Sequence, residues 1–218
     1  MGSEGMAKIT WYGHAMFSVE ASDGRRLVMD PFSPKIGKEP PSLEAEVVTL
    51  SHDHYDHNEW RSVRGTPKVI RDVGRFSLDG IEIKGIPAFH DESQGAKRGR
   101  DIIFKISVDK VSIAHMGDYG QEKLSEEQRR ELEGIDVLML PIGGVYTIDA
   151  AKALEVIDEI GPKIAIPMHF KIPEVNISIA GVEPFLSKAR KVERKPSTVT
   201  VEKKDIPSET AVWVMDYE

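Results

Sequence analysis

Short runs in which apolar and polar residues alternate dominate the first half of the chain. Alternation with a period of two is typical of strands that bury one face. The predicted strands cover residues 8–12, 15–20, 25–30, 47–50, 68–70, 81–86, 102–108 and 110–114. Ser22, Asp23 and Gly24 supply a turn between the second strand and the third. We therefore expect the chain to begin as a small β-meander and to continue as further strands.

The second half alternates apolar strands with helical patterns. Strands are predicted at residues 137–140, 164–166, 198–201 and 211–214, and helices at residues 125–132, 149–160 and 182–192. Ser125 and Gln128 stand at the spacing of a capping box, which begins a helix. Gly161 and Pro162 end the middle helix. The pattern predicts an α/β chain in which strands outnumber helices.

The length of 218 residues fits one domain with a sizeable core. We expect residues 6–218 to form that domain, and residues 1–5 to be a cloning remnant or a disordered N-terminus. No stretch approaches the roughly 20 apolar residues of a membrane span, and the start of the chain lacks the apolar core of a signal peptide. A cytoplasmic protein is therefore expected, while the oligomeric state is not predicted.

Two features of the composition restrict the chemistry. The chain has no cysteine, which excludes disulfides and thiolate ligands, so any metal must be held by nitrogen and oxygen. The formal net charge is −7, which disfavours a broad nucleic-acid surface. We therefore expect a small-molecule substrate rather than a nucleic acid.

A dense group of metal-ligand residues follows the predicted strand at residues 47–50. It has the sequence Ser-His-Asp-His-Tyr-Asp-His from residue 51 to residue 57. Residues i and i+2 of an extended chain point the same way, so His52 and His54 can bind one metal ion. Asp56 and His57 lie further along and can face a second ion. Three histidines and an aspartate at this spacing are typical of a metal site rather than of a solvated loop.

Three other predicted strands are also followed by an imidazole or a carboxylate. His90 follows the strand at residues 81–86, Asp118 follows the strand at residues 110–114, and His169 follows the strand at residues 164–166. Loops beyond the carboxyl ends of strands are where α/β proteins place their sites. We therefore expect these side chains to meet the 52–57 motif in one crevice.

The motif His52-x-His54-x-Asp56-His57 resembles the signature of the metallo-β-lactamase superfamily. Most of the chain is similar to one branch, which contains poorly characterised metal-dependent hydrolases, ascorbate-6-phosphate lactonase and N-acylphosphatidylethanolamine phospholipase D. The matching segments are Tyr12-Gly13-His14, Asp30-Pro31-Phe32, the 52–57 motif, Pro87-Ala88-Phe89-His90, His115-Met116-Gly117-Asp118, Pro141-Ile142-Gly143-Gly144 and Ile166-Pro167-Met168-His169-Phe170. The resemblance implies the α/β fold class and a four-layer αββα sandwich, the metallo-β-lactamase fold.

The resemblance also implies a site with two divalent metal ions. Its ligands would be His52, His54 and His90 for the first ion, Asp56, His57 and His169 for the second, and Asp118 as the bridge between them. A solvent-derived hydroxide between the ions would be the nucleophile, so Asp56 and Asp118 are the residues expected to be catalytic. Zn²⁺ is the first choice for nitrogen and oxygen ligands, with Mn, Fe or Ni as alternatives.

Two histidines compete for the third position on the first metal ion. His90 matches the Pro-Ala-x-His segment of the branch. His115 lies three residues before Asp118, so it lies further back on its strand if Asp118 points into the site. We favour His90 as the ligand and expect His115 to be hydrogen-bonded behind the site, but the sequence leaves both alternatives open.

Four further side chains could support the ligands or contact the substrate. His14 either lines the pocket or is a structural histidine. Asp30 either accepts a hydrogen bond from a ligand histidine or is a turn residue. Arg98, with Lys97 and Arg100 in the loop after His90, either binds a phosphate or carboxylate of the substrate or is solvated. Tyr146 either contacts the substrate or packs as a buried aromatic ring.

Three functions are compatible with this site. The first is a metal-dependent hydrolase that cleaves a lactone, amide or phosphoester bond in a small molecule. The second is a metallo-nuclease acting on RNA or DNA, which the net charge disfavours. The third is a non-catalytic metal-binding protein, which the complete set of ligand-type residues disfavours. We predict the first function; the sequence determines neither the substrate, nor the general acid, nor the metal used in the cell.

Overall fold

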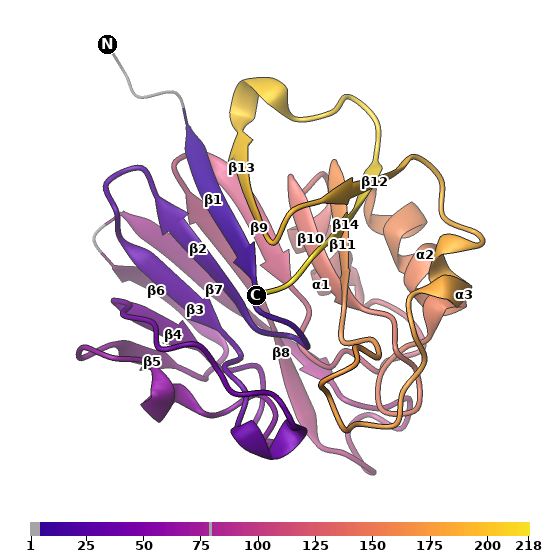
Figure 1. Cartoon of the computed structure of the whole chain (residues 1–218). Helices are drawn as coiled ribbons and strands as arrows, with labels where there is room; N and C mark the ends of the chain where they lie inside the picture. The colour runs from indigo at the N-terminus through magenta and orange to yellow at the C-terminus, as the bar shows by residue number, and fades with distance from the viewer. Residues whose placement is uncertain (1–4, 79) are drawn as a thin grey trace.

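Two β-sheets lie against each other in the computed structural model, which describes residues 5–78 and 80–218 (Figure 1). Of the tail expected at residues 1–5, residues 1–4 lie outside this part of the chain. Gly5 is buried, and its carbonyl oxygen accepts a hydrogen bond from the backbone N–H of Lys203 at 3.1 Å. The expectation that residues 6–218 form one domain stays a prediction.

The first sheet has six strands in the order β13-β1-β2-β3-β4-β5. Its strands are β1 (Met6–Trp11), β2 (Phe17–Ala21), β3 (Arg26–Met29), β4 (Val47–Thr49), β5 (Lys68–Ile70) and β13 (Thr198–Glu202). β1, β2 and β3 form the predicted antiparallel meander, and the turn at Gly24 takes a positive φ of 91°. β3, β4 and β5 run parallel, so the ends of β3 and β4 open at the same edge.

The second sheet has eight strands in the order β12-β14-β11-β10-β9-β8-β7-β6. They are β6 (Gly74–Leu78), β7 (Ile81–Phe89), β8 (Arg100–Val108), β9 (Val111–His115), β10 (Val137–Pro141), β11 (Ile164–Met168), β12 (Val192–Lys195) and β14 (Ala211–Met215). β9, β10 and β11 are parallel, and β7 has the same direction because it is antiparallel to β8, which is antiparallel to β9. The segments that follow β7, β9 and β11 therefore emerge at one edge.

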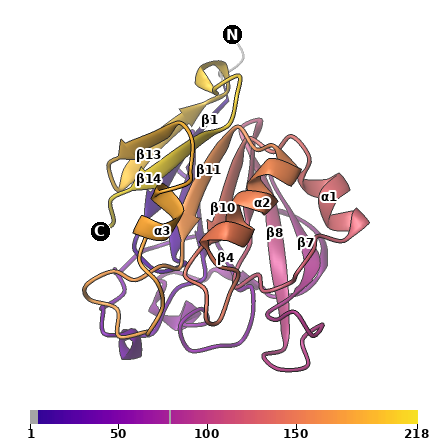
Figure 2. The same cartoon turned by 90° about the vertical axis from the view of Figure 1, so that its right-hand side faces the viewer.

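Helices cover the outer face of the eight-stranded sheet. They are α1 (Glu126–Leu132), α2 (Ala150–Ile160) and α3 (Glu183–Leu186), and Figure 2 shows them in a row, with α3 on the left, α2 in front of β10, and α1 on the right beside β7 and β8. The predicted capping box of Ser125 and Gln128 begins α1. Asp149 caps α2 by accepting from the N–H of Lys152, and Gly161 ends it with a φ of 63°.

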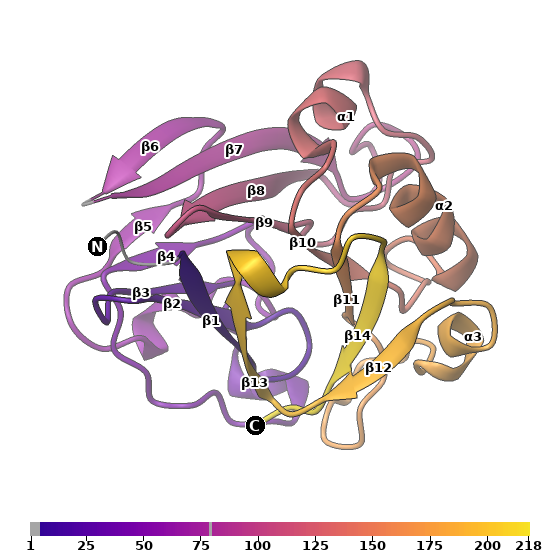
Figure 3. The same ribbon diagram turned by 90° about the horizontal axis from the view of Figure 1, so that it is seen from above.

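The six-stranded sheet has less helical cover than the eight-stranded one. Among residues 5–78, the connections of its strands contain only the 3-10 turns η1 (Pro34–Ile36) and η2 (Trp60–Ser62); a third turn, η3 (Lys203–Asp205), follows β13. Seen from above, α1, α2 and α3 all lie along the other sheet (Figure 3). The metallo-β-lactamase fold expected from the sequence is confirmed. Of the two helical layers in the expected αββα arrangement, the described residues form only the one on the eight-stranded sheet.

The face-to-face packing explains the continuous apolar strands. Every residue of β10 and β11 is buried, because these central strands have the other sheet on one face and α2 on the other. The buried apolar side chains of both sheets belong to one cluster. In the described part of the chain, no helix is long and apolar enough to cross a membrane.

One predicted helix is wrong. We expected residues 182–192 to be helical, but only α3 forms, and the chain becomes the edge strand β12 at Val192. Lys191 adopts a left-handed φ of 49°, which interrupts a helix. The strand pairing of β12 with β14 outweighs the weak local helical pattern, since most residues between α3 and β12 are polar.

Two strand boundaries also differ in ways that matter for the site. We expected a strand over residues 15–20, but Met16 closes a turn by donating its N–H to the Gly13 carbonyl oxygen at 3.0 Å, so β2 starts at Phe17. The strand expected to reach Asp30 ends one residue earlier, at Met29.

β6 was not predicted at all, because three of its five residues are glycine or polar and it lies at the sheet edge.

Candidate metal centre

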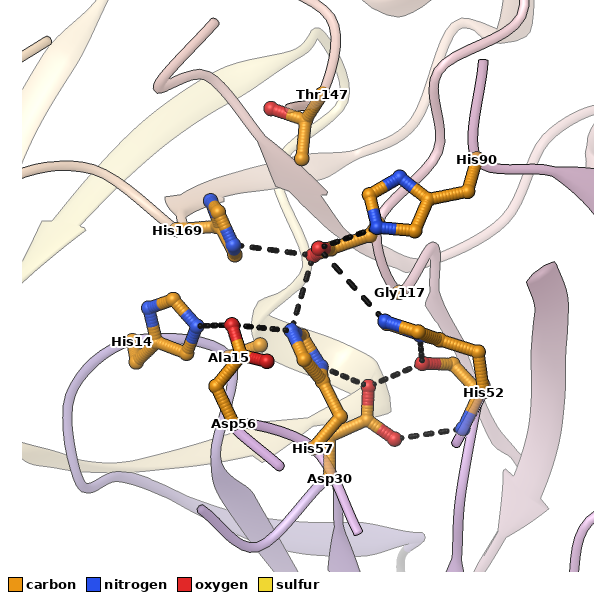
Figure 4. Close-up of polar contacts among 12 residues, drawn as sticks. His14, Ala15, Asp30, His52, Asp56, His57, His90, Gly117, Thr147 and His169 are labelled. Atoms are coloured by element: carbon orange, nitrogen blue, oxygen red, sulfur yellow. Dashed lines mark hydrogen bonds and ion pairs between the residues drawn. The ribbon is translucent and has the colours of Figure 1, made fainter. Parts of the chain in front are cut away.

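Side chains from both sheets converge where the strand ends of the two sheets meet (Figure 4). The 51–57 segment follows β4 and Asp30 follows β3, both in the six-stranded sheet. His90 follows β7, Asp118 follows β9 and His169 follows β11, all in the eight-stranded sheet. The structure therefore brings together residues that are up to 139 positions apart in a chain of 218, from Asp30 to His169, as the strand-end pattern predicted.

Three of these residues lie in the left-handed backbone region. His14 has a φ of 51°, Asp30 a φ of 43° and His169 a φ of 50°. Positive φ is uncommon for residues other than glycine, and residues held in it cluster at functional sites. Asp30 and His169 lie in sharp turns directly after β3 and β11, and His14 lies in the connection between β1 and β2. The sharp turns direct these side chains toward the centre of the site.

The carboxylate of Asp118 lies at the centre, and its two oxygens face different groups. Oδ1 lies 3.1 Å from Nε2 of His57 and 3.2 Å from Nε2 of His169. Oδ2 lies 3.2 Å from Nε2 of His90 and 3.9 Å from Nε2 of His52. The side chain of Asp118 is only 3% exposed, so these imidazoles rather than water surround it. One carboxylate is thus shared by two sets of histidines.

These two sets are the two candidate metal-binding groups at Asp118. The first, which we term the three-histidine cluster, consists of His52, His54 and His90, with ligand atoms within 4.8 Å of one another. The second, which we term the mixed cluster, consists of His14, Asp56, His57 and His169, with the same spacing. A further group of Asp30, His52 and His57 lies beneath them.

Both clusters are supported from behind by buried hydrogen bonds. Nδ1 of His57 donates to Oδ2 of Asp30 at 2.8 Å, which is one of the two roles that the sequence left open for that carboxylate. Nδ1 of His52 lies 2.9 Å from Oγ of Ser51, which in turn donates to Oδ2 of Asp30 at 2.5 Å. These bonds occupy Nδ1 of both rings and leave Nε2 directed at the centre, which is how partners behind a metal ligand orient it.

Asp101 was not identified from the sequence. It is buried at the start of β8, where Oδ1 lies 3.5 Å from Nδ1 of His52 and accepts the N–H of Asp118 at 3.3 Å. A side chain at Gly117 would collide with Asp101 and Ser51, which explains the glycine there. In the sequence, the only signal for Asp101 is an acidic residue at the start of an apolar strand. Burial raises the pKa of the Asp101 carboxyl group.

The electrostatics of the site are those of a tightly coupled ionic network. Burial alone would raise the pKa of Asp118, but the imidazoles of His169 and His57 hold it well below its usual range. Burial alone would lower the pKa of His57, but the carboxylates of Asp118 and Asp56 raise it well above the usual value. Cations on the nitrogens could replace the protons that this network holds, since metal ligands must be deprotonated.

His115 takes no direct part in either cluster. Its Nε2 donates to the backbone carbonyl of Ala15 at 2.8 Å, and its Nδ1 accepts the N–H of Gly117 at 3.2 Å. Both ring nitrogens are therefore used by the backbone, and the ring is fully buried. His90, by contrast, presents Nε2 to Asp118. This geometry favours His90 over His115 as the third ligand.

His14 lies inside the mixed cluster rather than at its edge. Its Nε2 donates to Oδ2 of Asp56 at 3.1 Å, and its ring centre lies 4.1 Å from that of His169. Its carbonyl oxygen also accepts the N–H of His169 at 3.0 Å, which ties the β1–β2 turn to the end of β11. Burial, followed by the nearby His169, lowers the pKa of His14 to about 4. His14 therefore holds Asp56 and His169 in place as a neutral ring.

The donor set fits divalent metal ions. Among the described residues, Nε2 of His52, His57 and His169 and Oδ1 of Asp118 are buried and form no hydrogen bond of good geometry. Buried polar atoms rarely stay without partners, so their convergence indicates that cations are the missing partners. Imidazole nitrogen and carboxylate oxygen are ligands of Zn²⁺ and related ions.

A pocket of about 570 Å³ opens from the two clusters to the surface. Its lining residues are His54, Tyr55, Asp56, His90, Lys97, Arg98, Asp118, Tyr146, His169, Asn176, Ile177 and Ser178. Tyr146 and Arg98, both substrate candidates from the sequence, are therefore at its wall. Close backbone packing shapes the same region, because a side chain at Gly143 would collide with the carbonyl oxygen of His169. A pocket of this size suits a small-molecule ligand.

The sandwich, with a histidine- and aspartate-rich site at the meeting strand ends, defines the class of proteins with the metallo-β-lactamase fold. Residues 8–169 match the family described as beta-lactamase superfamily domain. The chain therefore belongs to that family and to the metallo-β-lactamase superfamily.

Similar proteins include one from Thermotoga maritima described as a putative Zn-dependent hydrolase of the metallo-β-lactamase superfamily. Its crystal structure is 36% identical, covers 98% of this chain and 100% of its own, and has a TM-score of 0.80. A metallo hydrolase from Ignicoccus hospitalis is 25% identical over 90% of this chain and 99% of its own, with a TM-score of 0.63. A UPF0173 metal-dependent hydrolase from Methanoculleus marisnigri is 33% identical over 187 residues, which cover 75% of this chain and 80% of the relative.

Proposed function

We propose that this protein is a metal-dependent hydrolase with two divalent metal ions, which cleaves a lactone, amide or phosphoester bond in a small molecule. The position of Asp118 carries the proposal, because one of its oxygens faces the three-histidine cluster and the other faces the mixed cluster. A carboxylate placed in this way would serve as a ligand common to two metal ions. The relatives named as metal-dependent or Zn-dependent hydrolases support the same activity.

The residues that would hold the ions follow from the two clusters. The three-histidine cluster would hold one ion, and Asp56, His57 and His169 of the mixed cluster would hold the other. Zn²⁺ is the preferred ion for such ligands, with Mn, Fe or Ni as alternatives. His14 would position Asp56 through its hydrogen bond, and Asp30, Ser51 and Asp101 would orient His52 and His57.

Bound divalent ions would lower the pKa of a water molecule toward neutrality and polarise the bond to be cleaved. The chain supplies the rest. Asp118 and Asp56 would balance the positive charge of the two divalent ions. The buried rings of His57 and His169 shield the inner side of the site from solvent. His54, which is exposed and lines the pocket, lies where the substrate enters. The reacting group would therefore meet the site from the pocket side only.

Asp118→Asn tests the proposal, because it keeps the size of the side chain and removes its charge. We expect wild-type protein saturated with Zn²⁺ to hold two ions per chain and to hydrolyse a chromogenic ester, lactone or phosphodiester. The variant should lose metal from both clusters and at least about 100-fold in kcat/KM. Elemental analysis of the purified chain and a substrate panel measure the two effects.

Asp53→Asn is the matched control, since Asp53 is an exposed acid in the same segment whose side chain, among the described residues, accepts a hydrogen bond only from Asn58. It should leave metal content and hydrolysis unchanged. One ion per chain in the wild type, or unchanged metal content in Asp118→Asn, would contradict the two-metal site. Cleavage of RNA in preference to every small substrate would instead identify a metallo-nuclease, and a fully metallated but inert protein would be a binding protein.

A further inference from the structure

Asp91, which is adjacent to the candidate metal ligand His90, orders the loop between β7 and β8 by hydrogen bonds to its backbone. The carboxylate of Asp91, which directly follows His90 and is buried, accepts four backbone N–H groups of this loop. They belong to Ser93 at 2.8 Å, Gly95 at 3.0 Å, Lys97 at 3.0 Å and Arg98 at 2.7 Å. The N–H of His90 closes the loop on the carbonyl of Gly99 at 3.1 Å. The metal centre and the residues at 97 and 98 thus share one rigid unit.

Arg98 lies in the pocket wall with much of its hydrogen-bonding capacity unused. Its Nη2 donates to the carbonyl of Val145 at 3.0 Å, and its guanidinium lies 5.7 Å from the ring centre of Tyr146. In the described part of the chain, no carboxylate comes within 4.0 Å of this guanidinium, whereas Lys97 is paired with Glu92. A guanidinium has five N–H donors, and its planar fork matches a carboxylate or a phosphate.

Val145, whose carbonyl oxygen accepts the hydrogen bond from Arg98, has an unusual backbone conformation. Val145 adopts a left-handed φ of 61°, which is an outlier for a β-branched residue, and it is 65% exposed. This turn aims the Val145 carbonyl at Arg98 and brings Tyr146 beside it. Tyr146 is 42% exposed and Tyr55 is 49% exposed, so two aromatic rings are open to solvent at the pocket wall. Exposed aromatic rings beside a cation are typical of a ligand site.

We propose that the substrate carries a carboxylate or phosphate group, in addition to the bond that is cleaved, and that Arg98 binds this group while Tyr55 and Tyr146 contact an apolar part. This inference deepens the proposed function and rests on it. The rigid loop lowers the entropy lost on binding, because the backbone that carries Arg98 is already ordered. The anionic group would determine specificity, since it lies outside both metal clusters.

Two p-nitrophenyl esters, one anionic and one neutral, test this assignment on the Zn²⁺-loaded protein. They are p-nitrophenyl hydrogen terephthalate, whose free carboxylate cannot reach its own ester carbonyl, and its neutral methyl ester. We expect the wild type to prefer the acid, and Arg98→Gln to lower kcat/KM for the acid by about tenfold or more. In the same variant, kcat/KM for the methyl ester should change by less than about twofold. Arg98→Lys should retain part of the preference, because it keeps a charge without the fork.

Arg100→Gln is the matched control, because Arg100 is an exposed arginine of the same strand-loop junction that does not line the pocket. Calorimetric titration with benzoate, phenyl phosphate and benzamide provides a second readout. Weaker binding of one anion, but not of benzamide, to Arg98→Gln would support the site and show which anion it prefers. The assignment is wrong if Arg98→Gln lowers kcat/KM for both esters by the same factor. It is also wrong if the variant binds both anions with the affinity of the wild type.

The two proposals can fail separately. Metal-dependent hydrolysis that is indifferent to Arg98 would overturn the anion site and leave the hydrolase intact. Anion binding that depends on Arg98, in a protein that hydrolyses nothing, would support the anion site and overturn the hydrolase.

Discussion

The three-histidine cluster and the mixed cluster share the carboxylate of Asp118, yet they are held in different ways. The mixed cluster is largely buried, includes the acid Asp56, and has an internal hydrogen bond from His14 to Asp56. Asp30 supports it from behind through His57. The three-histidine cluster has no acid of its own and contains the exposed His54. Among the hydrogen bonds of the described residues, none supports the ring of His54.

This difference predicts an order of metal affinity. An ion in the mixed cluster would meet a negative charge from Asp56 and rings already oriented by buried partners, so its binding would require less ordering. An ion in the three-histidine cluster would rely on neutral rings and on the second oxygen of Asp118. We therefore expect the mixed cluster to bind metal more tightly and the three-histidine cluster to be the one that exchanges metal with solvent.

Removing one histidine from each cluster should give the largest contrast. His57→Ala should lose the tightly bound ion and lower the free energy of unfolding of the metal-free protein by about 3 kcal/mol, because it removes the imidazole that pairs with both buried carboxylates, Asp30 and Asp118. His54→Ala should lose only the weaker ion and change the free energy of unfolding by less than about 0.5 kcal/mol. Metal titration and urea unfolding measure these effects. A loss of the tighter ion in His54→Ala would reverse the proposed order.

A second comparison concerns the histidine that completes the three-histidine cluster. His90→Ala should lower the affinity of that cluster for Zn²⁺ by at least about tenfold. His115→Ala should leave metal binding intact and cost about 2 kcal/mol of stability, since it removes a buried ring bonded to the Ala15 carbonyl. Competition with a chromophoric chelator measures the affinity. If His115→Ala impairs metal binding more than His90→Ala, His115 is the ligand.

The smallest expected effect is a pH dependence that arises from His14. Its folded-state pKa of about 4 lies below the ordinary value of 6.5, so the unfolded chain takes up a proton first as the pH falls. The metal-free protein should therefore lose about 1 to 2 kcal/mol of stability between pH 7 and pH 5 that a His14→Gln variant does not lose. Urea unfolding of both proteins at the two pH values measures the difference. Parallel pH profiles would show that the ring is not buried as a neutral base.

Much of the fold could be predicted because its signals are local. The capping box at Ser125, the Gly161 stop of α2 and the apolar runs of β10 and β11 each depend on neighbouring residues in the chain. The predicted helix at residues 182–192 failed for the opposite reason. Its outcome depends on pairing of β12 with β14, which comes 16 residues or more later in the chain. Local pattern does not contain that information.

The residues that support the site show the same limit. The motif from His52 to His57 was recognisable because its spacing is contiguous. Asp101 and Asp91 were missed, since each acts on groups whose positions depend on how β8 lies beside the 51–57 segment or on the path of a loop. A lone acid in the sequence has the same appearance whether it is solvated or buried against an imidazole.

The sequence by itself determined the chemistry of this protein: nitrogen and oxygen ligands in the absence of cysteine, most of them at the ends of predicted strands. Only the tertiary structure decided how they are shared between two clusters, that His115 bonds to backbone while His90 faces Asp118, and that Arg98 lines the pocket. The physical reason is that ligand type is a property of single residues, whereas distances of 3 to 4 Å between Asp118 and its histidines depend on strand order and on the left-handed turns of the chain.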